Sequence, residues 1–372
     1  MKRLAGILGI VLIGGVYSLV SAAQVPALIP PPQGAYTGAY IDFGETEDHV
    51  TLESILGFEE LVGKHQAIVA FANYWGENRF PKESLQIIYA YGAIPLVYWS
   101  PWGPPYEQNG PPGRCDLRRI LHGQWDAYID HWAQEARALG KPLLVAWGIE
   151  MNGTWFPWSG WFYGRGKPFP GKPGAYRGPE TYKAAYRYVV DRVRSQGAWN
   201  IQWVFHVNNY SYPDHVDWNA FAAYYPGSSY VDWLGMSAYG KQFPDEPWIT
   251  VPDAFDYPYD QLCSLDPAKP VIFAEWGVGE FPKAGSKARW ISEAMERMSW
   301  KYPRLKAAIF WHERWENEDG TYSNLKVNSS EEALEAYRKG VSSPFWISWP
   351  IVSDSPGFVR PSMHAQRNVT VP

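Results

Sequence analysis

Two glutamates stand at the ends of apolar runs, each with tryptophans beside it. Glu150 lies in WGIEMNGTWFPWSG, residues 147–160, and Glu275 lies in FAEWG, residues 273–277. An apolar surround disfavours a charged carboxylate and raises its pKa, which lets the group act as an acid near neutral pH. Two carboxylates facing one bond are what glycoside hydrolysis requires: one protonates the leaving oxygen, and the other attacks the anomeric carbon or activates water there. A lone Glu at a strand end more often pairs with an arginine, so the inference depends on both strand ends meeting.

The elements that would position these carboxylates are eight short apolar runs. They are AYIDFG (39–44), AIVAFANYW (67–75), IPLVYWS (94–100), PLLVAWGIE (142–150), IQWVFHVNN (201–209), VDWLGMSAY (231–239), PVIFAEWG (270–277) and KAAIFWHERW (306–315). Helical stripes lie between several of them, the clearest over residues 125–139, 182–193 and 286–300, with apolar residues at i, i+3 and i+4. Continuous apolar strands that alternate with helices indicate a parallel sheet.

Eight β/α units predict a closed (β/α)8 barrel, a TIM barrel of the α/β class, as a single catalytic domain over residues 34–350. A doubly wound open sheet is the alternative fold. Its dinucleotide fingerprint is missing, because no strand is followed by G-x-G-x-x-G. We therefore expect the barrel.

In such barrels the active site lies at the carboxyl ends of the strands, so the residues that end each run are candidates. Strand alternation predicts Glu150 on one face with Leu144, Ala146 and Gly148, and Glu275 on one face with Val271 and Phe273. Both carboxylates would then point into the barrel mouth. Other strand-end residues expected there are Asp42, Asn73, Trp99, His206, Asn208, Tyr239 and Trp311.

The composition narrows the class of partner. Aromatic residues make up 17% of the 372 residues, including 21 Trp. Flat rings stack on the apolar face of a pyranose, with core packing as the alternative explanation. Charged residues are 19% and the net charge is −5, so no basic surface is expected for nucleic acid. We expect a β-linked polysaccharide or oligosaccharide as partner and a monomeric chain.

The N-terminal segment predicts export. Lys2 and Arg3 precede an apolar run over 4–20 and the small residues 21–23, the pattern of a secretory signal peptide over residues 1–23. An uncleaved anchor is the alternative, although the run is short for a bilayer. The rest of the chain would have no membrane contact and would be secreted or periplasmic. Residues 24–33 are expected to be a Pro-rich spacer, and 351–372 an irregular tail.

Several further features are expected to be peripheral. GRGKPFPGKPG (164–174) lacks the Ser/Thr of a phosphate loop and suggests a long mobile flap, and HERWENED (312–319) suggests a solvated acidic loop, with cation binding as its alternative. Whether Cys115 and Cys263 pair stays open. No metal-binding motif, cofactor motif or serine-hydrolase elbow is present, so neither a metal nor a cofactor is expected.

These motifs resemble glycoside hydrolase family 26, the β-mannanase family of retaining barrel clan A. Its acid/base motif, His-Glu-Met-Asn-Gly-x-Trp-Phe-Pro-Trp, is similar to IEMNGTWFPW, and its nucleophile segment after the seventh strand is similar to FAEWG. The resemblance covers most of the predicted barrel. It implies a secreted, retaining, endo-acting β-glycosidase that works by double displacement.

The resemblance also implies residue roles. Glu150 would be the general acid/base, Glu275 the nucleophile, Tyr239 a hydroxyl holding the nucleophile, Trp155 a sugar platform, and Trp311 the stacking residue beneath the sugar at the cleaved bond. For each of the last three, packing in the core or at the rim is the alternative.

The sequence departs from the family motif at Ile149, where the family has His. An aliphatic side chain cannot donate a hydrogen bond to a substrate hydroxyl. His206, Asn208 and Asn209 are candidates for the lost polar contact. Mannan is the family's substrate, and mixed-linkage β-1,3/1,4-glucan and β-xylan stay open beside it. The other hypothesis is a degenerate barrel that binds or helps to process exopolysaccharide without cutting it.

Overall fold

The computed structural model describes residues 26–103 and 112–353. Its main sheet has the order β11-β1-β2-β3-β4-β5-β6-β7-β8, and β1 also pairs in parallel with β8. The sheet therefore closes on itself, and the predicted barrel is confirmed. The barrel strands are β1 (Ala35–Ile41), β2 (Ile68–Tyr74), β3 (Ile94–Ser100), β4 (Leu143–Trp147), β5 (Ile201–Asn208), β6 (Trp233–Tyr239), β7 (Val271–Gly277) and β8 (Leu305–His312).

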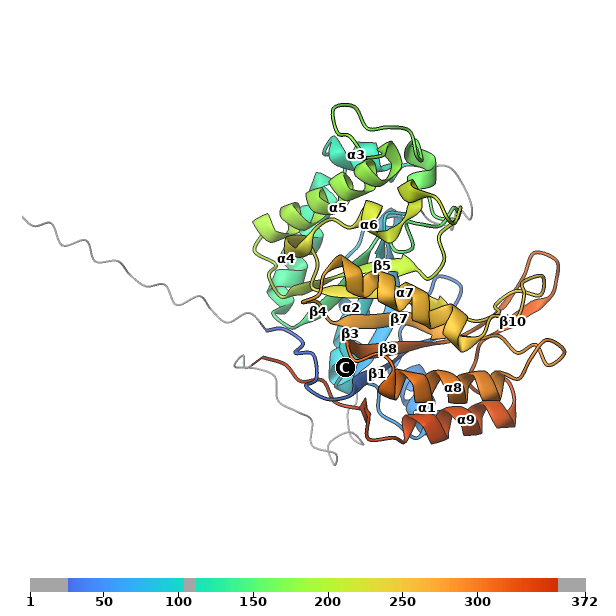
Figure 1. Ribbon diagram of the computed structural model, residues 1–372. Coiled ribbons are helices and arrows are strands. Elements are labelled where there is room, and N and C mark those ends of the chain that lie inside the picture. Colours follow the sequence, from blue (N-terminus) through green and yellow to red (C-terminus); the bar gives the residue numbers. More distant parts are fainter. Residues whose placement is uncertain (1–25, 104–111, 354–372) are drawn as a thin grey trace, which may run out of the picture.

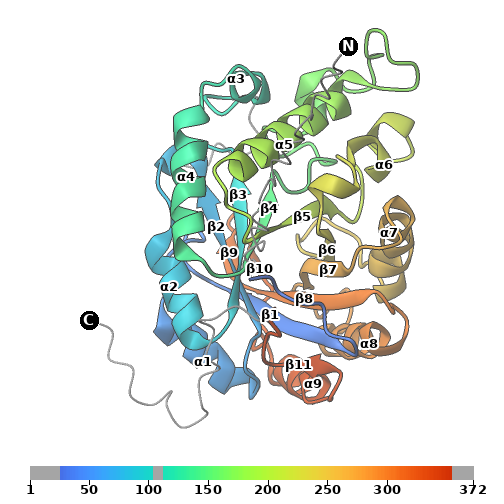
Figure 2. The same cartoon turned by 90° about the vertical axis from the view of Figure 1, so that its left-hand side faces the viewer.

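Helices surround these strands, as Figure 2 shows for α1, α2, α4, α5, α7 and α8. The helices are α1 (Leu52–Val62), α2 (Lys82–Tyr91), α3 (Leu117–Leu121), α4 (Asp126–Leu139), α5 (Arg177–Ser195), α6 (Phe221–Tyr224), α7 (Val251–Leu265), α8 (Lys287–Trp300) and α9 (Glu331–Val341). Short 3-10 turns are η1 (Trp75–Glu77), η2 (Gly160–Tyr163), η3 (Asp217–Asn219) and η4 (Ser228–Tyr230). No helix in residues 26–103 or 112–353 is long and apolar enough to cross a membrane.

Three short strands lie outside the barrel ring. β9 (Arg314–Glu316) and β10 (Tyr322–Asn324) form an antiparallel hairpin after β8, which projects beyond the barrel strands in Figure 1. β11 (Trp346–Ile347) pairs in parallel with the start of β1. The segment that follows β8 is therefore partly ordered into a hairpin.

The three helices expected from the sequence are present and begin or end at the residues the sequence indicates. α4 ends at Gly140, whose φ of 64° is the left-handed conformation that glycine adopts without strain. α8 begins after Ser286, whose hydroxyl accepts a hydrogen bond from the Arg289 N–H at 3.3 Å. The stripe over 182–193 lies within α5.

Residues 26–33, expected to be a spacer outside the fold, contact the barrel. Leu28 is buried and forms an antiparallel bridge with Val352. The Leu28 N–H donates to Gln202 Oε1 at 2.7 Å, and Gln202 Nε2 donates back to the Leu28 carbonyl at 3.1 Å. This segment and residues 351–353 lie together near the start of β5. The expected signal peptide, 1–23, and the tail from 354 onward lie outside the described residues.

Most of the described tryptophans are buried, and several of them pack between strands and helices. Trp99 of β3 stacks on Trp132 of α4, with ring centroids 4.2 Å apart, and Trp276 of β7 stacks on Trp290 of α8 at 6.4 Å. The tryptophans less than 2% exposed are Trp75, Trp99, Trp132, Trp147, Trp158, Trp203, Trp233 and Trp276. The high aromatic content is therefore first of all a property of the core.

The closing seam of the barrel leaves no room for a side chain at Gly38 of β1. A Cβ there would lie 2.4 Å from Ile309 Cδ1 of β8 and 2.8 Å from the Ile68 carbonyl oxygen of β2. The backbone oxygen cannot move without disturbing the strand pairing on that side. Glycine at this position lets the first strand approach both of its neighbours.

We expect Gly38→Ala to lower the free energy of unfolding by about 1–3 kcal/mol, the usual cost of overpacking a core. Gly57→Ala is the matched control: it lies within α1, and nothing lies within 4 Å of its added Cβ. The control should be neutral or stabilising, because alanine favours helix more than glycine does. Urea unfolding followed by circular dichroism measures both. Equal stability of the two variants would contradict the role of Gly38.

Candidate active site

Glu275 reaches the barrel mouth because β7 contains a bulge. Along the pairing with β6, Met236 lies opposite Phe273 but Ser237 lies opposite Glu275, so Ala274 is an extra residue. Such a bulge re-aims the side chains that follow it. The carbonyl of Ala274 accepts a hydrogen bond from the Tyr98 hydroxyl at 2.7 Å.

The bulge corrects the prediction from simple alternation. The ring of Phe273 packs on Phe255 of α7, with centroids 5.0 Å apart, and therefore faces the helices. Glu275 lies two residues after Phe273, so in a regular strand both side chains would face the helices. The prediction that Val271, Phe273 and Glu275 share a face is wrong, although Glu275 still points inward.

Glu150 follows β4 in a turn. Both Gly148 and Glu150 are in the left-handed region, with φ of 57° and 53°. A Cβ on Gly148 would lie 3.3 Å from a ring carbon of Tyr182 on α5, so Gly148 faces the helices and does not share a face with Glu150 as predicted. A non-glycine residue at positive φ is strained. The Glu150 N–H donates to the His206 carbonyl at 2.8 Å, which holds the turn against β5.

Each carboxylate accepts a hydrogen bond from an aromatic side chain. Trp155 Nε1 donates to Glu150 Oε2 at 2.8 Å, and the Tyr239 hydroxyl donates to Glu275 Oε2 at 2.8 Å. Ser237 lies opposite Glu275 across β6 and β7, and its hydroxyl lowers the pKa of both carboxylates. The charge of Glu150 raises the pKa of Glu275, as expected for two carboxylates at one mouth. The structure thus brings Glu150, Glu275, Trp155 and Tyr239 together.

Burial and mutual repulsion set the charge of this pair. Burial raises the pKa of Glu275 well above its usual range, and the Glu150 charge raises it further, while the hydrogen bonds from Tyr239 and Ser237 lower it. Burial also raises the pKa of Glu150, opposed by the hydrogen bonds from Ser237 and Trp155. Two neighbouring carboxylates of this kind titrate as one unit and keep one proton between them over a broad pH range.

Trp311 lies on the inner side of β8 at the same mouth. Its ring stacks on Tyr40 of β1, with centroids 3.9 Å apart and planes at 15°. Its Nε1 donates to Glu313 Oε2 at 2.8 Å. One face of the indole is therefore covered and its orientation fixed, and the ring is 7% exposed.

Two further carboxylates, Glu47 and Glu313, belong to the site and were not predicted. Burial raises the pKa of Glu47 to about 7, opposed by the hydrogen bond from Tyr74 and helped by the charges of Asp48 and Glu150. Burial and the Glu47 charge raise the pKa of Glu313 to about 8. The expectation of a solvated loop over 312–319 is wrong at Glu313. Both residues lie in acidic loops after strands, and nothing in the sequence marks which acids turn inward.

Trp99 and Asn73 do not reach the mouth, which corrects their prediction as substrate contacts. Trp99 is fully buried, and its Nε1 donates to the Tyr128 hydroxyl of α4 at 2.9 Å. Asn73 Oδ1 accepts from Trp132 Nε1 of α4 at 3.0 Å. The two residues are partners across β2 and β3 and share the outer face of the barrel. The inward residue of β3 is Tyr98.

His206 and Asn208 lie at the end of β5. His206 is buried, with Nε2 2.8 Å from Ser237 Oγ. Asn208 is half-buried, and its Nδ2 donates to the Tyr210 carbonyl at 2.8 Å. The backbone of Asn208 exchanges hydrogen bonds with the Asn152 amide. Asn208 thus ties the loop after β4 to the end of β5.

The remaining expected features lie away from the carboxylates. Cys115 and Cys263 form no disulfide with each other. Residues 164–174 form successive turns, closed by a bridge between Pro168 and Tyr176. Among the described residues, no three His, Cys, Asp or Glu side chains are arranged to hold a metal ion.

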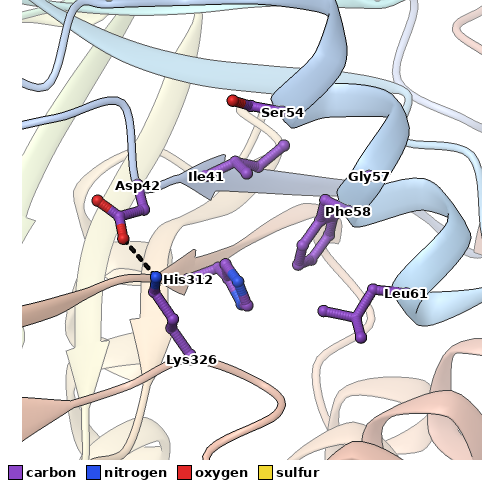
Figure 3. A pocket seen from close by; sticks show the side chains of 8 residues that line it. All are labelled: Ile41, Asp42, Ser54, Gly57, Phe58, Leu61, His312 and Lys326. Atoms are coloured by element: carbon purple, nitrogen blue, oxygen red, sulfur yellow. Dashed lines mark ion pairs between the residues drawn. The ribbon is translucent and has the colours of Figure 1, made fainter.

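A separate depression of about 270 Å³ lies outside the barrel wall beside α1 (Figure 3). Asp42 and Lys326 form an ion pair at its edge, with 2.5 Å between Oδ2 and Nζ. His312 lies in it against Phe58, on the side of β8 opposite to Trp311. Asp42, a strand-end residue expected at the mouth, is therefore engaged in this ion pair.

We expect Glu275→Gln to raise the free energy of unfolding near neutral pH, because the variant no longer holds an ionisable carboxyl that burial keeps from ionising. The folded pKa of Glu275 is raised, so the folded state resists ionisation, and the wild type loses stability as pH rises above the unfolded pKa. Glutamine retains an oxygen for Tyr239 but carries no charge.

The gain should vanish below about pH 4, where the unfolded carboxyl is protonated too. Unfolding by urea at several pH values measures it. Glu293→Gln, at an exposed position on α8, is the matched control and should show no such pH-dependent gain. A Glu275→Gln variant less stable than the wild type at pH 7 would contradict the electrostatic account.

The chain is similar to known proteins in sequence and in fold. Residues 115–317 match the family model described as Glycosyl hydrolase family 26. Endoglucanase H of Acetivibrio thermocellus is 33% identical over 341 residues, covering 88% of this chain and 33% of that protein. Mannan endo-1,4-beta-mannosidase of Bacillus subtilis (strain 168) is 30% identical over 247 residues, covering 65% of this chain and 58% of that protein.

Among solved structures, the catalytic domain of the Bacillus sp. JAMB-750 GH26 endo-beta-1,4-mannanase superposes with a TM-score of 0.60 at 20% identity, covering 84% of this chain and 87% of that one. At this identity the likeness concerns the fold. The chain spans about a third of the length of Endoglucanase H and 58% of the length of the B. subtilis mannosidase. From the family match and the shared barrel, we conclude that the chain belongs to glycosyl hydrolase family 26.

Proposed function

We propose that the chain is a retaining, endo-acting β-glycosidase that cleaves a β-linked glucan. The observation that carries this proposal is the pair of buried carboxylates, Glu150 and Glu275, each of which accepts a hydrogen bond from an aromatic side chain at the barrel mouth. Retaining glycosidases hold their two carboxyl groups about 5–5.5 Å apart, whereas inverting enzymes need about 6.5–9.5 Å to fit a water. The charge of Glu150, which raises the pKa of Glu275, favours the narrower spacing.

In the proposed mechanism, Glu275 attacks the anomeric carbon while Glu150 protonates the leaving oxygen. The glycosyl enzyme on Glu275 is then hydrolysed by a water that Glu150 deprotonates. The charge states support this division. With the proton on Glu150, the part of the repulsion on Glu275 that comes from Glu150 disappears. The Tyr239 hydrogen bond then favours the ionised form of Glu275.

The aromatic residues at the mouth suit a sugar chain. Trp311 is held in place by Tyr40 and Glu313. In the proposed mechanism its ring stacks beneath the sugar at the cleaved bond. Trp155 is half-buried, and its ring meets the edge of Tyr212, which is 50% exposed, at 5.5 Å. Amphipathic rings bind the apolar faces of pyranoses. We place the binding cleft along these rings.

The glucan preference is supported by Ile149 and by the relatives. The Ile149 side chain is buried and offers no hydrogen bond at the position where the mannanase motif has His. The match to Endoglucanase H covers 88% of the chain, whereas the match to the B. subtilis mannosidase covers 65%. We therefore propose β-glucan, including mixed-linkage β-1,3/1,4-glucan, ahead of mannan and β-xylan.

We also propose that the protein acts outside the cytoplasm, secreted or periplasmic. The support is the sequence of residues 1–23, with a basic start, an apolar run and small residues at its end. A polysaccharide substrate fits that location, because such polymers do not cross membranes unaided.

We expect kcat/KM on soluble β-glucan to exceed that on β-mannan and β-xylan by about ten-fold or more, the scale on which one pocket contact discriminates. Reducing-end release from the three polymers measures it, with Glu275→Gln as the inactive control and Glu293→Gln as the active one. Mannan as the preferred substrate would overturn the glucan assignment. If the wild type and Glu275→Gln both bind glycan and neither releases sugar, the protein is a glycan binder.

We expect azide to rescue Glu150→Ala in part and to yield a β-glycosyl azide, because azide replaces the water that attacks the glycosyl enzyme. Azide with Glu275→Ala should yield the α-product, if any, because the nucleophile itself is missing. Nuclear magnetic resonance of the azide products distinguishes the two anomers. The opposite pattern would exchange the two roles.

A further inference from the structure

The side chain of His206 is hydrogen-bonded to Ser237 and not to Glu275. Its Nε2 lies 2.8 Å from Ser237 Oγ but 4.0 Å from Glu275 Oε1, beyond a hydrogen bond. Its side chain is buried, and burial lowers its pKa to about 3. The imidazole is therefore neutral throughout the working range of a glycosidase, and its hydrogen bonding does not change with pH there.

The surroundings of the ring favour one tautomer. Among the described residues, Nδ1 has no hydrogen-bond partner although it is buried. A proton on Nδ1 would leave a buried N–H unpaired, which is rarer and more costly than an unpaired acceptor. It would also force the Ser237 O–H to donate to Nε2. A proton on Nε2 avoids both costs.

With the proton on Nε2, His206 donates to Ser237 Oγ, and the Ser237 O–H is left to donate elsewhere. Ser237 lies opposite Glu275 across β6 and β7, and its hydroxyl favours the ionised form of both Glu275 and Glu150. Hydrogen bonds donated in series strengthen one another in a dry site. We propose that His206 and Ser237 form a positioning pair that directs the Ser237 hydroxyl toward whichever of the two active-site carboxylates is ionised and so sets the pH range of catalysis. This inference rests on the proposed glycosidase function.

Groups other than His206 and Ser237 also face these two carboxylates and affect their pKa values. Glu275 faces the charges of Glu150 and Glu47 and the phenol of Tyr239. The buried phenol of Tyr98, on β3, lies near the same carboxylates. Glu150 accepts from Trp155 as well. All of these groups remain in a Ser237 variant, so a change in the pH profile reports the Ser237 hydroxyl itself.

The first test is the pH profile of kcat/KM for Ser237→Ala. Removing a donor that favours the ionised carboxylates raises both macroscopic pKa values of the pair. The acidic limb, which reports ionisation of Glu275, and the basic limb, which reports proton loss from Glu150, should both move to higher pH. The expected shift is about one pH unit, since a hydrogen bond to a charged group is worth about that much. A profile unmoved on both limbs would overturn the proposal.

Conservative variants separate positioning from packing. Ser237→Thr keeps the hydroxyl, so both limbs of its pH profile should stay at the wild-type pH values. Ser237→Cys is a near isostere with a weak donor, and its limbs should shift as those of Ser237→Ala do. His206→Gln places an amide N–H near Nε2 and should hold the profile, whereas His206→Leu should shift it in the same direction. If the pH profile shifted with the volume of the side chain instead of its hydrogen-bond capacity, the proposed role of His206 and Ser237 would be contradicted.

A double variant tests whether His206 acts through Ser237. Ser237→Ala combined with His206→Leu should show no further shift beyond Ser237→Ala alone, because the second residue then has nothing to orient. Additive shifts would show that His206 acts on its own. Thermal unfolding of each variant confirms that the folded enzyme is compared.

A second readout keeps the pair testable if no glycan is cleaved. The ¹³C carboxyl resonances of Glu150 and Glu275 can be titrated in the wild type and in Ser237→Ala, without substrate. Higher pKa values in the variant would support the pair even if the glycosidase proposal failed. Identical titrations would overturn the pair even in an enzyme active on glucan.

Discussion

The repulsion between two carboxylates buried in one mouth is the constraint on which the site depends. Water is largely excluded there, so neither Glu150 nor Glu275 can be ionised cheaply, and together they cannot both be. Hydrogen-bond donors that the fold holds in place stabilise the ionised forms of the two carboxylates. Tyr239 comes from β6, and Trp155 from the loop after β4. The barrel wall and the aromatic layer behind it keep these donors in place.

The aromatic residues have two separate tasks. Trp99 and Trp276 stack on helical tryptophans and join the barrel to its outer layer. Trp155 and Trp311 face the mouth, and each donates its indole N–H to a glutamate. Composition alone cannot separate these tasks, because both use the same side chain. What distinguishes them is whether each ring faces the helices or the mouth.

The sequence predicted the order and approximate limits of all eight strands, because fully buried parallel strands are continuous apolar runs between helical patterns. It also located Glu150 and Glu275, since residues that follow such runs gather at one end of the barrel. The sequence did not predict which way each of these strand-end side chains faces. Trp99 and Asn73 follow the same rule as Glu150 and Glu275 but face α4. Glu47 and Glu313 lie in loops, whose path no periodicity describes.

The bulge at Ala274 has an evolutionary consequence. A lineage in which β7 became regular without losing a residue would keep the hydrophobic pattern of the strand, yet its acid would turn toward the helices. Such a lineage would retain every glutamate and every tryptophan while its chemistry was lost. Counting retained acids among homologues would then misjudge which of them are still enzymes, and the register of the seventh strand against its neighbours would be the better criterion.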